Sequence, residues 1–360
     1  MKNNTIEIRS ISINDYTLDT NNIVNLSVYN SIDQVGYTME FIYNDITDMK
    51  NKLPIKGGEK ATIVFVDVFK TKVKKTFILR TIKTLGDPEL ESNKIHATFI
   101  TEDAFLMGIN RVYASYNDTV SNIVKKYIPN VQDKNPTTDK IQVLIPGFSI
   151  TKAIRYLRQF TNNYFVFENN TGFQYSSISD LLIPSPDIYK FKSNNRKDRY
   201  FIIDSKELQL FNTIEETWIN MYNNIYKTYN PNSKTIDTKT ADIKDEQAKL
   251  KTLGSGENFS DYLVQNLSPK IEMFGYSPNI LNYPKIVDLM FNKKFELLLN
   301  GDLNLQVGKT INLQTKDKLV NGLYLITKVA HHIDAKDYHT KVQVEKNAYF
   351  KGDIISNVVI

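Results

Sequence analysis

The sequence predicts an α+β fold that is mainly β, with two small antiparallel β-barrels and α/β insertions between them. Three observations predict it. Apolar residues alternate with period two in a block at each end of the chain, and the spacing becomes helical in the region between them. Strand-like segments of the first block also recur in the same order in the second. At 360 residues the chain has room for two or three domains.

The first expected barrel covers residues 1–105. Its segments place apolar side chains on one face at every second residue, and turns such as Gly57-Gly58 and Gly86-Asp87-Pro88 separate them. Roughly six strands at this short spacing are typical of a small antiparallel barrel or sandwich. The alternating sets are Val24, Leu26 and Val28; Met39 and Phe41; Ala61, Ile63 and Phe65; Phe77, Leu79 and Thr81; and Ile95, Ala97 and Phe99.

Residues 106–197 are expected to form an α+β insertion domain. Asp118 is placed to cap a helix that carries Val120, Ile123, Val124 and Tyr127, and Ser149 or Thr151 is placed to cap a second helix. That second helix has an apolar stripe, and an aromatic hairpin follows it directly. The stripe is Ile150, Ala153, Ile154, Leu157 and Phe160, and the hairpin joins 164–167 to 173–175 through a turn at 169–172.

The second expected barrel draws on residues 198–232 and 284–352. It includes a strand with Leu323, Leu325, Thr327 and Val329 on one face, and a partner strand with Tyr338, Thr340, Val342 and Val344. The polar residues 233–283, with the flexible Gly254-Ser255-Gly256, are expected to be a loop with one exposed helix. A helix bearing Ile286, Leu289 and Met290 leads into the last strands.

Three short segments of the first block resemble three of the second, in the same order. Residues 57–65 resemble 307–313, residues 77–83 resemble 324–329, and residues 95–99 resemble 338–342. Strands resemble one another easily, so chance remains an alternative, but the common order favours two copies of one small barrel. Three such chains in a ring would present six similar units.

The duplication also explains Gly308-Lys309-Thr310, which ends like a phosphate-binding loop. That loop needs a glycine at position 303 and a helix after Thr310. The sequence has Leu303 and the strand-like Ile311-Asn312-Leu313 instead. We therefore expect Gly308 to relieve the backbone where a strand begins.

The chain resembles the central baseplate hub proteins of contractile-tailed bacteriophages, which belong to a tail-tube-like family. The segments that carry the resemblance are Gly301–Gly308, Tyr324–His332 and the aromatic hairpin Asn163–Tyr175. The resemblance implies two tail-tube-like barrels separated by insertion domains. It also implies a homotrimer, a pseudo-hexameric ring that connects the six-fold tail tube to the three-fold central spike.

The resemblance further implies which partners and location to expect. The partners would be the tail tube protein, the central spike protein, the baseplate wedge proteins and the tape measure protein. The protein would be part of the virion, in the tail baseplate, after assembly in the host cytoplasm. The family is structural, so no enzymatic activity, catalytic residue, cofactor or metal is expected.

Composition narrows the alternatives. The formal net charge is +5, too small for a strong nucleic-acid grip, and there are no cysteines for disulfides, thiolate metal sites or a Cys nucleophile. No apolar run approaches the ~18 residues of a membrane span, and the first residues lack the apolar core of a signal peptide. We therefore expect a protein made and kept in a cytoplasm, with no membrane and no sequence-specific nucleic acid among its partners.

Two groups of ionisable residues suggest a site at first reading. His332 and His339 would face each other across a hairpin that turns at Asp334–Asp337, with His331 on the other face. Such a pair could hold zinc with a turn carboxylate, but no third ordered ligand is evident, so a solvated hairpin end is favoured. Glu215 and Glu216 would face opposite ways in a strand, which is unlike a hydrolase carboxylate pair.

The lysines at positions 70, 72, 74 and 75 lie on or beside a hairpin. Lys70, Lys72 and Lys74 would share one strand face and protect an exposed edge. In a tube that passes DNA we expect them to point away from the channel, because phosphate contacts would slow transit. Two alternative functions stay open: a baseplate-associated cell-wall hydrolase, and a carbohydrate-binding tail component that stacks sugars on Tyr164 or Trp218.

Overall fold

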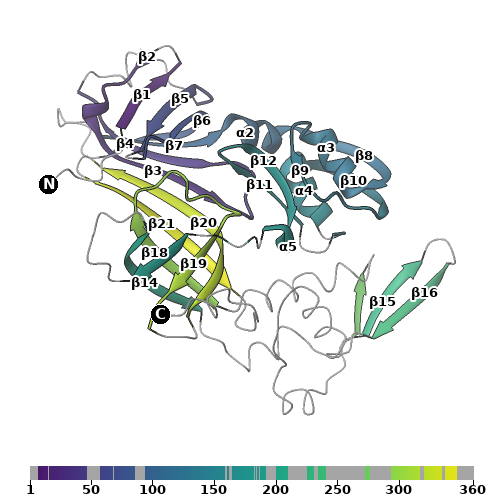
Figure 1. The fold of residues 1–360 in the computed structure, drawn as a ribbon. Coiled ribbons are helices and arrows are strands. Elements are labelled where there is room, and N and C mark those ends of the chain that lie inside the picture. Colours follow the sequence, from purple (N-terminus) through teal and green to yellow (C-terminus); the bar gives the residue numbers. More distant parts are fainter. Residues whose placement is uncertain are drawn as a thin grey trace.

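The computed structural model of the chain has two β units joined by a mixed α/β region (Figure 1). No helix among the described residues is long and apolar enough to cross a membrane. The structure describes residues 7–14, 16–46, 57–67, 69–85, 94–158, 160–161, 164–181, 183, 185, 187–191, 200–209, 225–230, 234–240, 272–275, 293–316, 320–334 and 337–346.

The N-terminal β unit is an antiparallel sheet with the strand order β3-β4-β7-β6-β5-β1-β2. Alternation builds it as the sequence predicts: in β5 every second residue, from Ala61 to Phe65, is buried in the core that this unit encloses. Its elements are β1 (Glu7–Ile13), β2 (Tyr16–Thr17), a short 3-10 helix (Thr20–Asn22), β3 (Ile23–Ser31), β4 (Thr38–Asn44), β5 (Lys60–Val66), β6 (Lys72–Leu85) and β7 (Lys94–Thr101).

A mixed α/β insertion follows directly. β8 pairs with β10, β11 pairs with β12, and β9 adds to β12 in parallel; helices α3 and α4 pack against the β8–β10 pair. The predicted aromatic hairpin is confirmed as β11 and β12. The elements are α2 (Glu102–Ile109), β8 (Arg111–Thr119), α3 (Val120–Tyr127), β9 (Gln132–Asp133), β10 (Lys140–Ser149), α4 (Ile150–Arg158), β11 (Tyr164–Asn169), β12 (Gly172–Ser177) and α5 (Ile178–Leu181).

Two details of the insertion differ from the sequence prediction. The cap of α3 is Thr119, whose hydroxyl accepts from the Asn122 N–H at 3.3 Å, whereas Asp118 accepts from the Asn122 side chain. Strands β8 and β10 were not predicted, because β10 contains Pro146 and Gly147, which indicate a loop, and a bulge accommodates them. The cap of α4 is Ser149, one of the two predicted candidates.

The C-terminal β unit is a closed barrel. Its strands pair in the order β19-β13-β14-β18-β21-β20, and β20 pairs with β19 to complete the circle. β13 lies in the region that the sequence assigned to the insertion domain, but its hydrogen bonds are to β14 and β19. The strands are β13 (Ile188–Phe191), β14 (Phe201–Gln209), β18 (Lys293–Asn300), β19 (Thr310–Gln314), β20 (Gly322–Asp334) and β21 (Tyr338–Lys346).

A separate sheet contains β15 (Ile225–Asn230), β16 (Thr235–Thr240) and β17 (Glu272–Gly275). The sequence prediction placed β15 in the second barrel, but β15 pairs with β16 and β17. It also took the β16 region for a loop, and pairing with β15 makes it a strand despite its polar side chains. The predicted helix around Leu289 lies outside the described residues.

The two β units have the same strand order. Taken in chain order, β1, β3, β4, β5, β6 and β7 of the first unit correspond to β13, β14, β18, β19, β20 and β21 of the second. The sheet order is β3-β4-β7-β6-β5-β1 in the first unit. In the second unit the corresponding strands have the same order, β14-β18-β21-β20-β19-β13. Irregularities recur too. The β6–β7 ladder has a bulge between Leu79 and Thr81, and the β20–β21 ladder has one between Ile326 and Lys328.

A glycine just before β5 and a glycine just before β19 make the same backbone hydrogen bond in the two units. The Gly58 N–H donates to the Leu79 carbonyl at 2.9 Å, and the Gly308 N–H donates to the Ile326 carbonyl at 3.0 Å. Both glycines have positive φ, +91° and +80°. Gly308 therefore serves a strand entry, as predicted, and β19 follows it where a phosphate loop would need a helix.

The third predicted echo is out of register. When the two units are aligned on their bulges, Ile95 of β7 is equivalent to Thr340 of β21. The sequence comparison had matched Ile95 with Tyr338, two residues earlier. A shift of two keeps each side chain on the same face, so alternation alone cannot detect it.

Candidate functional site

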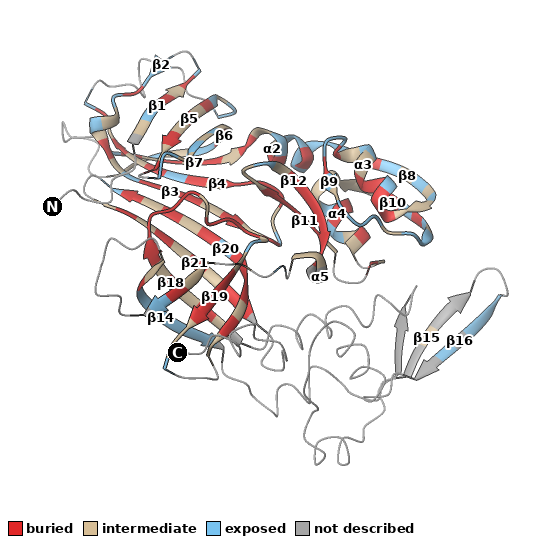
Figure 2. Cartoon of the chain, in the orientation of Figure 1, coloured by how far each residue is buried: buried red, intermediate tan, exposed pale blue. Residues whose placement is uncertain are grey.

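The two β units meet at a junction formed by one strand of each. β20 of the C-terminal unit pairs antiparallel with β3 of the N-terminal unit, from Lys328↔Ser31 to Asp334↔Asn25. This pairing fuses the two units into one sheet of thirteen strands. Figure 2 shows buried residues running through β3, β4 and β20, so the junction belongs to the core.

The three clustered histidines lie on β20 and β21, beside this junction. His332 and His339 are paired across the two strands, as predicted. The Nδ1 atom of His332 lies 2.9 Å from the hydroxyl of Ser27 on β3, and His339 lies 3.0 Å from the Asp337 carboxylate. Within the described residues no group of three or more potential metal ligands occurs.

His331 faces the opposite way, as predicted, and the structure shows that this face is buried. Its Nδ1 atom lies 2.9 Å from the Tyr338 hydroxyl and 3.2 Å from the Thr340 hydroxyl. Burial lowers the pKa of His331 to about 4, although the Asp302 carboxylate opposes this shift. The imidazole is therefore neutral at physiological pH and acts as a hydrogen-bonded part of the core.

A buried ion pair attaches the insertion to the N-terminal unit. Lys75 of β6 binds Glu168 at the end of β11, and the two side chains are 14% and 8% exposed. The Lys75 ammonium also reaches the Asn169 carbonyl at 3.2 Å and lies 4.4 Å from the ring centroid of Tyr37. Burial raises the pKa of Glu168, and Lys75 and the Thr101 hydroxyl oppose this shift.

The loop between β18 and β19 extends the polar network to the C-terminal unit. The Leu303 N–H donates to the Asp67 carboxylate at 3.1 Å, and the Leu303 carbonyl accepts from the Asn170 side chain at 3.0 Å. The side chain of Asn304 donates to the Thr71 hydroxyl at 2.9 Å. One loop therefore binds both the N-terminal unit and the β11–β12 hairpin.

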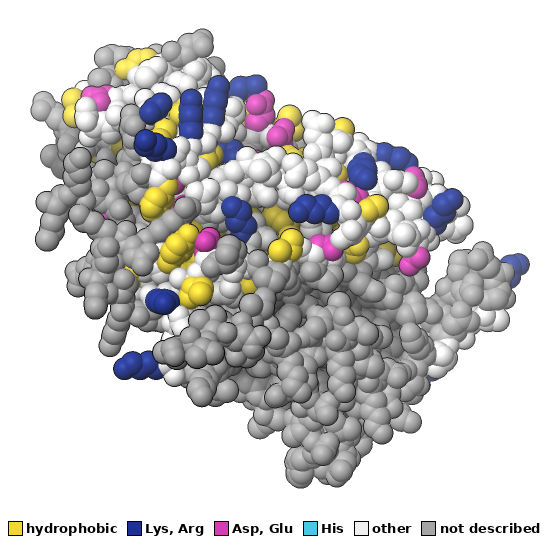
Figure 3. Space-filling view, in the orientation of Figure 1, with side chains coloured by type: hydrophobic (Ala, Val, Ile, Leu, Met, Phe, Trp, Pro, Cys, Tyr) yellow, Lys and Arg dark blue, Asp and Glu magenta, His cyan; other side chains and the backbone are white. Residues whose placement is uncertain are grey.

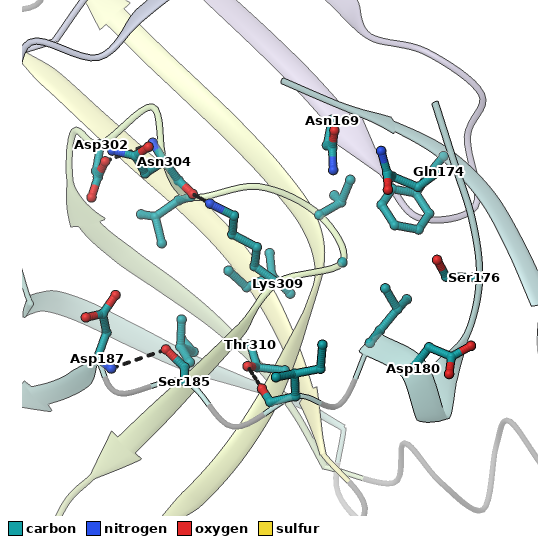
Figure 4. A pocket seen from close by; sticks show the side chains of 18 of the residues that line it. Asn169, Gln174, Ser176, Asp180, Ser185, Asp187, Asp302, Asn304, Lys309 and Thr310 are labelled. Carbon is teal, nitrogen blue, oxygen red and sulfur yellow. Dashed lines mark hydrogen bonds between the residues drawn. The ribbon is translucent and has the colours of Figure 1, made fainter. Parts of the chain in front are cut away.

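A cavity of about 360 Å³ lies between this loop, the β11–β12 hairpin and the linker after α5. Figure 4 shows Lys309 on the loop side of the cavity, where its ammonium group donates to the Asn304 carbonyl of the same loop at 3.1 Å. Gln174 and Asp180 line the hairpin side, and Asp187 lines the linker side. The wall mixes both charges with apolar side chains and does not select one ligand class.

The remaining sequence candidates have different outcomes. Lys72 and Lys74 are exposed, and Figure 3 shows basic side chains gathered over β5 and β6; whether they avoid a channel stays a prediction. Lys75 is not on that stripe, because it is buried at the junction. Tyr164 stacks near Tyr175 with ring centroids 5.0 Å apart. Glu215, Glu216, Trp218 and Gly254–Gly256 lie outside the described residues.

Sequence reasoning did not find the junction residues. Lys75 was expected only to lie on or beside a hairpin, and Glu168, Asp67 and Asn170 carried no local signal. Their partners are distant in the chain: 93 residues separate Lys75 from Glu168, and 236 separate Asp67 from Leu303. The only available signal was the break in the lysine alternation at Lys75.

A fold with two β units and an α/β insertion also occurs in solved structures of phage tail proteins. No family model matches the sequence, and no curated protein matches it. The comparisons with solved structures are more informative. A tail protein from Neisseria meningitidis MC58 is similar over 97% of this chain and 99% of its own, with a TM-score of 0.63 and 9% identity.

Two further phage tail proteins have a similar fold. The 43 kDa tail protein of prophage MuSo2 from Shewanella oneidensis matches 96% of this chain and 99% of its own, with a TM-score of 0.59 and 8% identity. The prophage tail protein gp18 from Listeria monocytogenes EGD-e matches 98% of this chain and 96% of its own, with a TM-score of 0.53 and 9% identity. The expected tail-protein fold is therefore confirmed, at identities that establish the fold alone.

Proposed function

We propose that this chain is a structural hub of a contractile phage tail baseplate. Three copies form a ring that connects the six-fold tail tube to the three-fold central spike. The observation that carries the proposal is the repeated strand order of the two β units and their fusion edge to edge through β20 and β3. Because each chain carries two similar units in one sheet, three chains could stack on a tube ring made of six single-unit subunits.

The symmetry follows from counting. Three chains contribute six β units, whereas the described part of each chain has one α/β insertion, built by α2 to α5. The β units therefore offer a six-fold face to a tube protein, and the insertions keep three-fold symmetry toward a spike. Wedge proteins and the tape measure protein are the other proposed partners. The proposed location is the virion baseplate, after assembly in the host cytoplasm.

We assign no enzymatic activity to this hub. What supports this assignment is that the contacts described between the units are attachments: a backbone ladder, side-chain hydrogen bonds and one buried ion pair. A peptidoglycan zymogram tests this assignment. Blank lanes are expected, and a cleared band from purified protein would favour the cell-wall hydrolase alternative.

The mass of the purified particle tests the ring. Interfaces of obligate oligomers bury on the order of 2,000 Å² or more, so a ring of three should persist at micromolar concentration. Multi-angle light scattering is expected to give three times the mass of one chain. A monomer at every concentration would contradict the proposal.

A further inference from the structure

Strand β14 is exposed in a way that no other long strand of the two units matches. Residues 203–208 are all exposed, so both of its faces are open to solvent, and Figure 2 shows it in pale blue. Ile203 and Leu208 are 39% and 41% exposed. β14 pairs with β18 from Ile202 to Gln209, but with β13 only at Phe201 and Ile202.

Its counterpart in the N-terminal unit is β3, and there the same edge is occupied. Both strands have a bulge after their first pair, between Ile23 and Asn25 in β3 and between Ile202 and Asp204 in β14. The edge of β3 that corresponds to the open edge of β14 pairs with β20, and Asn25 is the only exposed residue of β3. The contrast in burial between β3 and β14 therefore tracks the presence of a second neighbouring strand.

The strand equivalent to β20 is β6, and its later half also has one neighbouring strand. β5 pairs with β6 only from Lys72 to Ile78, whereas β7 continues to Leu85. In β20 the corresponding edge, beyond the end of β19, is the one that pairs with β3. Within the described chain no strand is paired with this edge of β6.

We propose that β6 of one chain pairs antiparallel with β14 of the next chain, repeating between chains the β20–β3 joint that exists within each chain. The inference rests on the proposed ring and specifies its interface. Aligning the two units on their bulges gives the register of this pairing. Leu85 and Lys206 are the equivalents of His332 and Ser27, which are paired within the chain, so Leu85 should pair with Lys206. In the same way Thr84 and Glu207, the equivalents of His331 and Val28, should pair.

The strand order keeps the two edges apart within one chain and makes them available to two different copies. The eight strands run in the order β14-β18-β21-β20-β3-β4-β7-β6, so β6 and β14 lie at opposite ends of this part of the sheet. They cannot meet within one chain, but a head-to-tail contact between chains joins them and closes into a ring when the rotation fits.

The edge chemistry of β14 fits the same pairing. An open strand edge with exposed apolar side chains favours pairing with another strand. Pairing would cover Leu208 and complete the backbone hydrogen bonds along β14.

Cysteine cross-linking tests the register directly, because the chain has no cysteine of its own. The two designed pairs are Leu85→Cys with Lys206→Cys, and Thr84→Cys with Glu207→Cys. Adjacent pairs in an antiparallel ladder alternate between the two hydrogen-bonding types, and their Cβ atoms lie about 4.5–5.5 Å apart, so at least one pair should close. The off-register control is Leu85→Cys with Glu207→Cys, whose side chains point to opposite faces.

Mild oxidation should convert at least one designed pair into covalent trimers on a non-reducing gel and leave the control uncross-linked. Mixing the Leu85→Cys and Lys206→Cys single variants should give dimers only between the two. If trimers form but neither designed pair links, the ring uses another edge and this inference fails while the hub proposal stands. If the wild-type chain stays monomeric, both fail.

A charge placed in the proposed register gives a second measurement that introduces no cysteine. Leu85→Lys puts a like charge opposite Lys206 and should raise the concentration needed for half-assembly by several-fold, whereas Leu85→Glu puts an opposite charge there and should not. If Leu85→Lys assembles like Leu85→Glu, the proposed contact is overturned. Circular dichroism confirms that each variant is folded.

Discussion

At the scale of single residues, two glycines of the β18–β19 loop lie directly against buried aromatic rings. A Cβ built on Gly301 would lie 1.9 Å from the ring of Tyr338, which is fully buried, and one on Gly308 would lie 2.4 Å from the ring of Phe167. Both glycines lie in the loop that binds the two units together. Replacing either forces a buried aromatic ring to move.

Gly301→Ala should therefore destabilise the protein by about 1–3 kcal/mol, the usual range for overpacking a filled core. Gly108→Ala is the matched control, because a Cβ there meets nothing within 4 Å and the residue lies in helix α2. The control should be neutral or slightly stabilising. Urea unfolding measures both, and equal midpoints would contradict the packing argument.

His331 gives the junction a defined pH dependence. Its pKa is lowered from 6.5 to about 4 by burial, so between these values the unfolded chain binds more protons than the folded chain. The stability that the neutral imidazole contributes is complete above pH 6.5 and is lost as the pH falls toward 4. The full effect is on the order of 3 kcal/mol.

His331→Gln keeps a hydrogen-bonding side chain at this position without an imidazole to titrate. The variant should lose part of the stability difference between pH 7 and pH 4.5, as measured by urea unfolding at the two pH values. His96→Gln, on β7 away from the junction, is the control and should keep the wild-type difference. A His331→Gln variant with the wild-type pH dependence would show that another group is responsible.

At the scale of elements, the ion pair of Lys75 and Glu168 joins β6 to the β11–β12 hairpin. Removing one partner leaves the other charge buried, which costs about 3–5 kcal/mol in comparable pairs, whereas replacing both with apolar residues is often neutral. The same reasoning predicts little effect at the exposed pair of Lys60 and Glu102, whose side chains are 61% and 32% exposed.

Glu168→Gln should therefore lower the urea midpoint markedly and increase hydrogen exchange in the hairpin, and the double variant Lys75→Met with Glu168→Leu should recover most of the loss. Glu102→Gln should leave both measurements unchanged. Comparable effects of Glu168→Gln and Glu102→Gln would show that the buried pair does not hold the hairpin.

Elements also show how far the sequence predicts the fold. The strands of the N-terminal unit and the aromatic hairpin follow from local alternation, because each has one buried face. β13 is only four residues long, β10 contains Pro146 and β16 is polar, so local patterns do not identify them. Contacts such as Ser27 with His332 span 305 residues, and no local pattern encodes such a pairing.

At the scale of the whole molecule, the repeated unit was predictable and its use at the junction was not. Short echoes such as residues 57–65 and 307–313 reflect a strand entry that both units share, including its glycine with positive φ. The fusion of the units through β20 and β3 depends on which edges are left open once each unit is folded. That outcome is a property of the assembled sheets.

The central claim is that a duplicated β unit lets three chains present six-fold packing. A cryo-EM reconstruction of the assembled particle, made without imposed symmetry, tests it most directly. Sections through the β units should show six similar lobes around an axial channel, and sections through the insertions only three. Three lobes at every level, or a particle without an axial channel, would contradict the account.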